Sequence, residues 1–269
     1  MMKYRTSQTL LLALLLINCH LINAESWKTA KYDTAWLPIT KAQLQGEIRK
    51  YANDATALFQ LWRRARYQKL TQVAFDTFRV LKNQQPRNAN ILAMYCMSIE
   101  QRFTPEGKPR FNASAQEMAV ETRRTAIEEA KKLNPMLWLC YAAQGRFEYN
   151  TTVFDVDDQV RIYRKALSVA PNISFTNVDY ADALITQAFQ RKQSYQTAIS
   201  YIKKAQRLAP VSSETCLDLI MTYRYRVPNR AKERQAAQDY LATIPPRVKL
   251  SPERRKWLAQ WGVIVPWKG

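Results

Sequence analysis

The chain has 269 residues and is strongly basic, with 41 lysine and arginine residues against 22 aspartate and glutamate residues. Its five glycines are too few for a β-rich fold, and it contains neither a GxxxxGK[ST] nor a GxGxxG phosphate loop. The one histidine, His20, lies in a segment that we expect to be removed, so the mature chain has no Ser–His–Asp or Cys–His catalytic pair and no histidine-based zinc site.

Residues 1–24 have the layout of a secretory signal peptide. Lys3 and Arg5 precede the apolar run Leu10–Ile17, and a candidate cleavage site ends at Ala24. The apolar run is shorter than the ~20 residues that cross a bilayer, and no long apolar run follows it, so we expect no transmembrane segment in the mature chain. The sequence therefore predicts cleavage near Ala24 and a secreted or periplasmic protein, with a leader retained as an anchor as the alternative.

Residues 25–54 form an N-terminal lead-in. Its first part has no periodicity and is expected to run extended along the first helices, with Trp27 and Trp36 as docking residues. A helix is predicted at about 41–52, beginning after Thr40.

A helical hairpin is clearest at residues 179–210. Apolar residues recur at helical spacing in both halves, basic and amide residues turn the chain at 190–193, and Pro210 ends the second helix. The residues that carry the pattern are Ile185, Phe189, Tyr195, Ala198, Ile202, Ala205 and Pro210. Neither half can bury its apolar stripe alone, so the hairpin needs neighbours.

The same spacing recurs along 55–246. A small residue lies five positions before each of Pro135, Pro171 and Pro210, and weaker copies end at Pro86 and Pro245. A small residue where two helices cross and a proline that ends the helix are typical of closely packed hairpins.

These residues resemble the tetratricopeptide repeat (TPR) family, whose pattern W-x2-L-G-x2-Y…A-x3-F…P recurs at about 34 residues. The match is loose, since the glycine of the first helix is present only as Gly145. The resemblance implies an all-α, right-handed helical-hairpin solenoid, a TPR-like superhelix of about five hairpins over 55–246. An irregular all-helical domain is the alternative.

The C-terminal residues 247–269 are predicted to cap the stack. Ser251 and Pro252 open a last helix, and Trp257, Leu258 and Trp261 give it one apolar face.

Two loops interrupt the array. The segment 104–115 contains two prolines and a glycine, and it is read either as a functional loop or as a neutral surface insertion. The linker 150–158 contains Asp155, Asp157 and Asp158, but it lacks the glycine and the closing glutamate of a calcium loop. We expect Asp157 and Asp158 to stabilise the N-terminus of the next helix, and no metal site is predicted.

Three cysteines follow the leader: Cys96, Cys140 and Cys216. All three lie among apolar residues in predicted first helices, so we expect buried thiols. A bridge between Cys96 and Cys140 is the one pairing that merits a test.

The sequence favours a protein without catalytic activity and without a cofactor. Ser200 and Lys203 match the S-x-x-K pattern of penicillin-binding proteins, but no KTG motif accompanies them and the neighbouring residues are typical of helix packing. Glu148, Asp155 and Asp157 are the only acids near a loop mouth, and a carbohydrate-active enzyme that uses a carboxylate pair is the third hypothesis.

In the TPR family the first helices line a concave groove that holds extended peptides or partner helices. Projecting each repeat onto that surface gives a partner-binding groove of Arg63, Arg66, Asn90, Met97, Arg146, Tyr149, Tyr180, Gln187, Met221 and Arg224. Arginine forks in such a groove favour an acidic protein or peptide, while its aromatic residues would hold apolar side chains.

We therefore expect a non-catalytic protein- or peptide-binding scaffold that acts outside the cytoplasm. The alternative is binding of an anionic envelope polymer or membrane surface through the basic exterior. Nucleic acid is not an expected partner, since the chain is predicted to be exported and carries no recognition motif.

Overall fold

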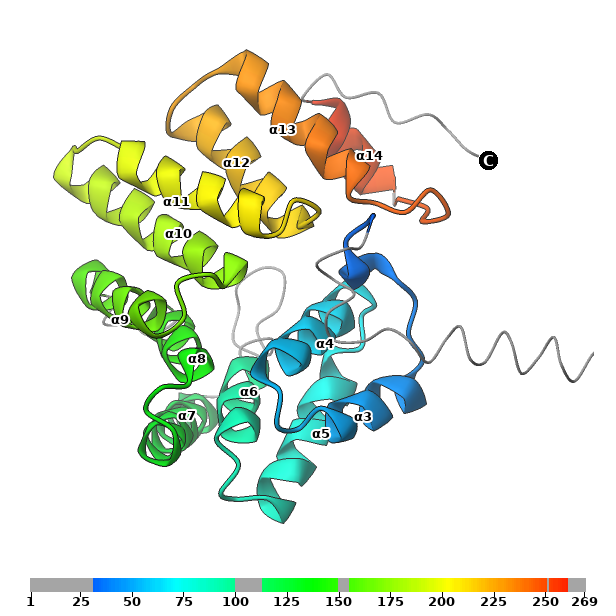
Figure 1. The fold of residues 1–269 in the computed structure, drawn as a ribbon, viewed down its shortest axis with the longest axis vertical. Coiled ribbons are helices and arrows are strands. Elements are labelled where there is room, and N and C mark those ends of the chain that lie inside the picture. Colours follow the sequence, from blue (N-terminus) through cyan, green and yellow to red (C-terminus); the bar gives the residue numbers. More distant parts are fainter. Residues whose placement is uncertain (1–30, 100–112, 150–154, 251, 261–269) are drawn as a thin grey trace, which may run out of the picture.

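The computed structural model describes residues 31–99, 113–149, 155–250 and 252–260, and within these ranges it contains helices and turns but no strand. The helices pair as antiparallel hairpins that follow one another around a curved stack (Figure 1). The predicted all-α architecture of helical hairpins is therefore confirmed.

Successive helices pair along the described chain. The lead-in contains a short 3-10 turn, η1 (Thr34–Trp36), and helix α3 (Lys41–Lys50). The hairpins that follow are α4 (Ala55–Tyr67) with α5 (Thr71–Gln84), α6 (Ala89–Ile99) with α7 (Ala113–Leu133), α8 (Trp138–Tyr149) with α9 (Val156–Val169), α10 (Ser174–Arg191) with α11 (Gln196–Leu208), and α12 (Ser213–Tyr225) with α13 (Arg230–Ala242). Helix α14 (Pro252–Ala259) lies beside the last of these hairpins (Figure 1).

Side-chain caps fix where several helices begin. The Thr40 hydroxyl accepts a hydrogen bond from the Gln43 amide, and the Gln43 side chain accepts one from the Thr40 amide, which is a complete capping box before α3. Asp155 caps α9 and places Asp157 and Asp158 in its first turn. The predicted helix start at Thr40 and the predicted role of the two aspartates are both confirmed.

Helix α10 differs from its prediction at both ends. It begins at Ser174 rather than at 179, because Phe175 and Val178 supply buried residues for a further turn. Near its C-terminal end, Phe189 was expected to share the apolar face, but its side chain is 59% exposed. The ring lies beside Arg226, whose guanidinium is 4.8 Å from the ring centre.

Helix α9 packs closely against α8 at Gly145. A Cβ atom added there would lie 2.6 Å from Cζ of Tyr163, a buried residue of α9, so only glycine fits beneath this ring. The glycine that the repeat pattern marks in this unit is therefore explained by helix–helix distance.

The hydrophobic core is divided between the two halves of the molecule. The larger part lies among α3 to α8 and reaches Phe175 at the start of α10. A second part joins α10 to α14, and Trp36 of the lead-in belongs to it. A small third group, which includes Tyr163 and Tyr180, connects α9 with α10.

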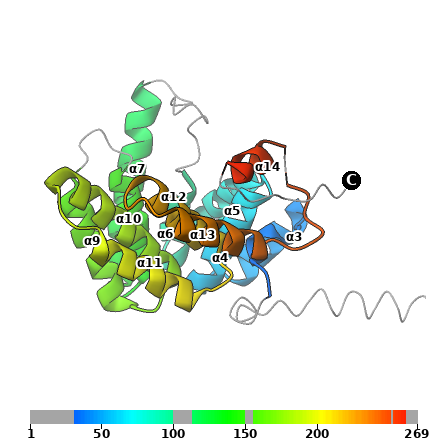
Figure 2. The same cartoon turned by 90° about the horizontal axis from the view of Figure 1, so that it is seen from above.

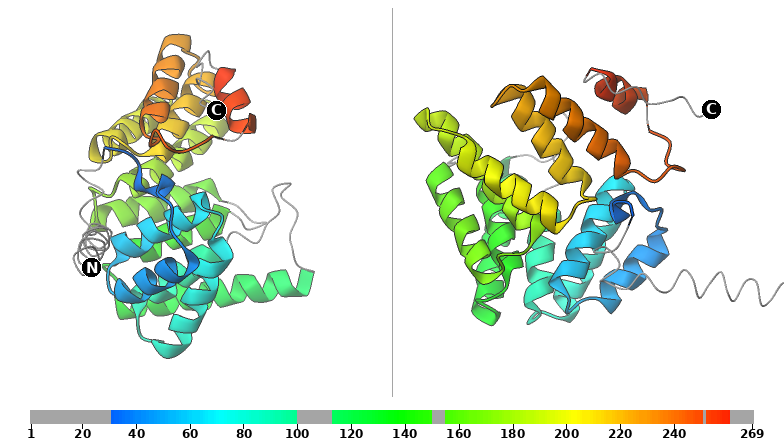
Figure 3. Two further views of the ribbon diagram at one scale, coloured as in Figure 1. Left: turned by 90° about the vertical axis from the view of Figure 1, so that its right-hand side faces the viewer. Right: turned by 45° about the horizontal axis from the view of Figure 1, so that its top comes forward.

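The lead-in lies between the first and last hairpins rather than along the first helices alone (Figures 1 and 3). Trp36 packs edge-on against Tyr67 of α4 and Tyr240 of α13, and its indole N–H donates to the Ser213 hydroxyl at 2.7 Å. The Asp33 amide donates to the Thr243 carbonyl at 2.9 Å. Trp36 is thus a docking residue, and residues 31–40 bridge the two ends of the repeat array; we call them the clasp.

Cys96, Cys140 and Cys216 are free and buried, as the sequence predicts. Burial is the main reason why the pKa of each thiol is raised to about 12. No bridge joins Cys96 to Cys140.

Several predictions concern residues outside the described ranges: the leader 1–24, Trp27, Ser251, Trp261 and nearly all of the 104–115 insertion. Within the described ranges, no helix is both long enough and apolar enough to cross a membrane. Helix α7 extends beyond the body of the molecule (Figure 2).

Candidate binding site: a charged cavity on the concave face

First helices of four hairpins, together with the clasp, enclose a cavity of about 270 Å³ on the concave side. It continues into a wider groove of about 930 Å³, and the two hollows share Arg66, Arg146, Asp179, Asp182 and Asp218. We call them the inner cavity and the outer groove. Helices α4, α8, α10 and α12 supply most of these walls, and Gln159 and Tyr163 of α9 add to the outer groove. First helices form the surface that stacked hairpins commonly present to partners.

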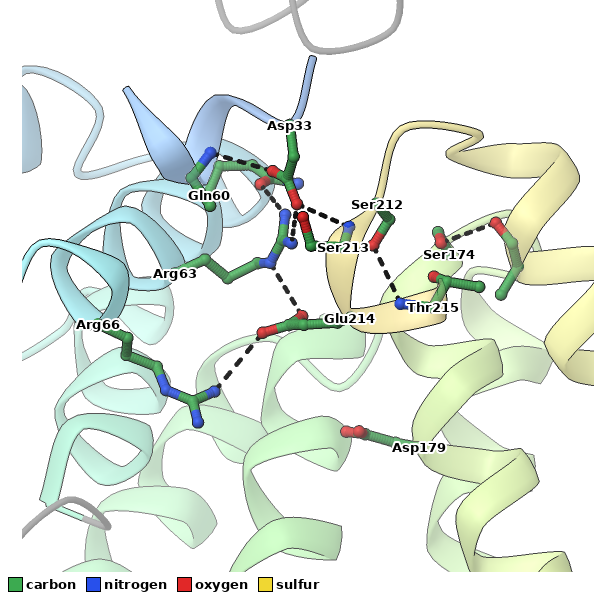
Figure 4. A network of polar contacts seen from close by, with 12 residues as sticks. Asp33, Gln60, Arg63, Arg66, Ser174, Asp179, Ser212, Ser213, Glu214 and Thr215 are labelled. Atoms are coloured by element: carbon green, nitrogen blue, oxygen red, sulfur yellow. Dashed lines mark hydrogen bonds and ion pairs between the residues drawn. The ribbon is translucent and has the colours of Figure 1, made fainter. Parts of the chain in front are cut away.

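Arg63 occupies one end of the inner cavity, where the clasp meets α4 and α12 (Figure 4). The side chain is nearly inaccessible to solvent, and its guanidinium donates to Asp33, to Glu214 and to Gln60 at 2.8–2.9 Å. Burial disfavours its charge, but the carboxylates of Glu214 and Asp33 outweigh this effect and raise its pKa. Arg63 therefore acts as a fixed internal cation that connects three segments.

Arg146 forms the second ion pair of the cavity. Its Nε and Nη2 donate to the two carboxylate oxygens of Asp179 at 2.9 and 3.0 Å, and its guanidinium lies 4.2 Å from the ring centre of Phe175. Burial raises the pKa of Asp179, although the charge of Arg146 opposes that rise. A bidentate pair stacked on an aromatic ring leaves this arginine little freedom to change partner.

Asp182 and Asp218 differ from these paired acids, because neither carboxylate has a hydrogen bond or an ion pair with a described residue. Asp182 is exposed to the solvent of the hollow, but the protein around it still disfavours the charged form of its carboxyl. This desolvation, followed by the charge of Asp179, raises its pKa to about 7. Desolvation and then the charge of Asp182 raise the pKa of Asp218 well above its usual range.

Apolar side chains form the rim of the outer groove. Met221 and Tyr225 of α12 line it and are 45% and 60% exposed. The exposed ring of Phe189 of α10 stacks with Arg226, which lines the same groove. Large exposed apolar side chains gathered beside a groove are typical of a contact surface for a partner.

Four of the predicted groove residues line these hollows: Arg63, Arg66, Arg146 and Met221. Arg66 is partly exposed, lies 3.7 Å from Glu214 and stacks on Trp62. Helical register therefore placed these residues on one surface, but the structure pairs Arg63 and Arg146 with acids of the chain itself.

The other predicted groove residues lie elsewhere. Met97 is buried in the larger core, and Tyr180 is buried against Tyr201 with its ring edge-on. Asn90 lines a separate surface hollow between hairpins, and Gln187 donates to Asp157 on α9.

Two further residues complete that set. Arg224 stands 3.9 Å from Glu233 of α13 and stacks on Tyr225. Tyr149 is the last residue of α8, and its side chain is outside the described part of the molecule.

Sequence reasoning missed the acids of the cavity: Asp33, Asp179, Asp182, Glu214 and Asp218. A register counted from the helix starts could have found some of them, since Arg63, Arg146 and Asp182 are each the ninth residue of their helix. Asp179 and Asp218 likewise share the sixth place. The helix start at 174, which the sequence did not predict, was needed for that alignment.

No described group of three or more His, Cys, Asp or Glu residues could hold a metal ion. Of the acids considered for catalysis, Asp155 caps α9 and Asp157 pairs with Arg191. The Glu148 side chain lies outside the described residues.

The hairpin stack and its concave, side-chain-lined cavity define the class: an all-helical protein of stacked helical hairpins. Among solved structures, the chain is similar to the crystal structure of a thermophilic TPR protein from Thermus thermophilus, with 11% sequence identity and a TM-score of 0.41. That match covers 75% of this chain and 89% of the other. No protein-family model and no curated protein matches the sequence.

Proposed function

We propose that the chain is a non-catalytic scaffold that binds a protein or peptide segment on its concave face. The observation that carries the proposal is the continuous hollow formed by the inner cavity and the outer groove, because helices from four different hairpins contribute to it. Its combination of ion pairs, unpaired carboxylates and exposed apolar side chains suits an extended polypeptide.

The proposal includes action outside the cytoplasm. It is supported by the charged start, short apolar run and small-residue site of residues 1–24. Three buried free thiols are compatible with an oxidising compartment, since burial and raised pKa values protect them from exchange.

An array of synthetic peptides probed with the purified chain tests groove binding. Combined Met221→Ala and Tyr225→Ala substitutions should weaken the affinity for bound peptides at least tenfold, since both side chains are exposed at the rim. Met136→Ala is the matched control, because Met136 is 65% exposed at the turn between α7 and α8. Affinities that the rim variants leave unchanged contradict a binding site in the groove.

A second candidate is binding of an anionic envelope polymer or membrane surface through the convex helices. Helix α11 favours it, because Lys203, Lys204 and Arg207 lie on it and its sequence contains no acidic residue. Exposed cations continue on the neighbouring hairpin as Arg230 and Lys232.

Vesicles that contain phosphatidylglycerol separate this candidate from the groove. Binding through the convex surface should fall steeply between low and physiological salt and should be lost when Lys203, Lys204 and Arg207 are changed to glutamate. Binding that resists both changes contradicts the second candidate.

A further inference from the structure

The cations of the concave face are already paired for the most part, whereas two of its carboxyl groups have no partner among the described residues. Arg63 and Arg146 hold Asp33, Glu214 and Asp179 at 2.9–3.0 Å. Asp182 and Asp218 line the floor shared by the inner cavity and the outer groove, and they have no partner among the described residues.

Two further arginines line the outer groove. Arg226 is one of them, and its guanidinium stacks on the ring of Phe189. Arg66 also lines both hollows and is directed at Glu214 (Figure 4). The groups without a partner at the floor are therefore two carboxyls, which become negatively charged when a bound cation stabilises their ionised form, on a protein whose overall net charge is +19.

An acidic segment is a poor fit to this arrangement. It would have to displace Asp179 from its bidentate bond to Arg146, or Asp33 and Glu214 from a buried Arg63, and each exchange leaves a carboxylate without its partner. It would also approach the two unpaired carboxylates.

We propose, on the basis of the binding function above, that the occupant is a peptide segment that places a lysine or arginine side chain between Asp182 and Asp218 and an adjacent apolar side chain against Met221 and Tyr225. The cation replaces the missing partner of both carboxylates, and the apolar neighbour covers exposed rim surface. The absence of a three-ligand metal cluster among the described residues favours an organic cation over a metal ion.

Discrimination comes from the pair of carboxylates. A lysine ammonium or an arginine guanidinium offers several donors to the two carboxylates and stabilises their ionised form, whereas an uncharged side chain supplies no opposite charge. The preference should therefore be lost when the cation is acetylated, even though the side chain keeps its length.

Fluorescence polarisation on labelled decapeptides tests the occupant. The peptides have lysine, arginine, acetyl-lysine or glutamate at the centre, each next to leucine, phenylalanine or glycine. We expect lysine and arginine peptides with an apolar neighbour to bind at least tenfold more tightly than acetyl-lysine and glutamate peptides. Combined Asp182→Asn and Asp218→Asn substitutions should remove that difference. Asp158→Asn is the control, since Asp158 is an exposed acid on the outer helix α9 that pairs with Arg161.

The possible outcomes distinguish the proposal of a cationic occupant from the proposal that the groove binds peptides. Binding that depends on Met221 and Tyr225 but favours glutamate, or ignores the two asparagine substitutions, overturns the cationic occupant and leaves the groove in place. Binding that ignores the rim residues, or no specific binding by any peptide, overturns both. Circular dichroism on each variant confirms that it is folded.

Discussion

A buried arginine holds the two ends of this repeat array together. Arg63 is 5% exposed, and it joins a helix of the first hairpin to the clasp and to the start of α12. Its partner Asp33 is 3% exposed and also accepts a hydrogen bond from the Ser213 amide. Removing one member of such a group leaves the other charge buried and unpaired, which costs more than the net stabilisation from the pair.

Arg63→Ala should therefore lower the free energy of unfolding by about 3–5 kcal/mol. Urea denaturation followed by circular dichroism measures the change. Arg79→Ala is the control, because Arg79 pairs with Asp76 on the exposed surface of α5 at 3.1 Å. Such exposed pairs contribute about 0–1 kcal/mol, so similar effects of the two substitutions contradict the role given to Arg63.

Asp182 links stability to pH in the opposite sense to a salt-bridged acid. Its pKa is about 7 in the folded chain, where Asp179, Asp218, Arg146 and Arg66 surround the same hollow, against about 3.9 in an unfolded chain. Between these values the folded state retains a proton that the unfolded state has released, so raising the pH from 4 to 7 removes stability.

Asp182→Asn should accordingly stabilise the protein more at pH 8 than at pH 5, relative to the unsubstituted chain. Urea unfolding of both proteins at the two pH values measures the difference. An equal effect at pH 5 and pH 8 would show that this carboxyl titrates normally in the fold.

At the scale of elements, the packing of α8 against α9 depends on Gly145. The ring of Tyr163 lies over it and is 2% exposed, so the ring has little room to move away from a new methyl group. Gly46 in α3 provides the contrast, since a Cβ added there meets nothing within 4 Å.

Gly145→Ala should destabilise the fold by about 1–3 kcal/mol, because overpacking outweighs the gain in helix propensity. Gly46→Ala should instead be neutral or stabilise it by up to about 1 kcal/mol, since alanine costs less entropy within a helix. Thermal unfolding of the two variants measures both. A stabilised Gly145→Ala protein would mean that α8 and α9 can separate freely.

The sequence predicted the hairpins well because their spacing is local. Small residues such as Ala205 and helix-ending prolines such as Pro210 can be recognised from the sequence of a single hairpin. The structure places Ala205 in the core. The cavity was predicted only in part. The register within each first helix placed Arg63 and Arg146 on the concave face. Their partners Glu214 and Asp179 belong to other hairpins, so no local sequence pattern connects the pairs.

At the scale of the whole molecule, the two larger hydrophobic cores are connected by Phe175, by the small group between α9 and α10, and by the clasp. Helices α3 to α8 contain one core and α10 to α14 contain the other. Trp36 of the clasp packs into the second core. The indole is 8% exposed and packs on Tyr67 and Tyr240. This contact should therefore strengthen the coupling between the two halves when they unfold.

Trp36→Ala should remove about 3–5 kcal/mol of packing and let α10–α14 exchange amide hydrogens before α3–α8. Hydrogen exchange followed by mass spectrometry measures each half separately. Phe75→Ala is the control, because Phe75 of α5 packs on Tyr95 of α6 within the first core. Simultaneous exchange of both halves in the Trp36 variant contradicts the coupling.

The bond from the Asp33 amide to the Thr243 carbonyl has a further consequence for how such a chain can change. An open solenoid gains or loses units freely, since each unit touches only its neighbours. In this protein, an added hairpin would move Thr243 and Ser213 away from Asp33 of the clasp, to which both are hydrogen-bonded. The clasp can contact both ends of the array at only one number of hairpins. Duplication or loss of a hairpin, which open arrays tolerate, should therefore be selected against in this protein.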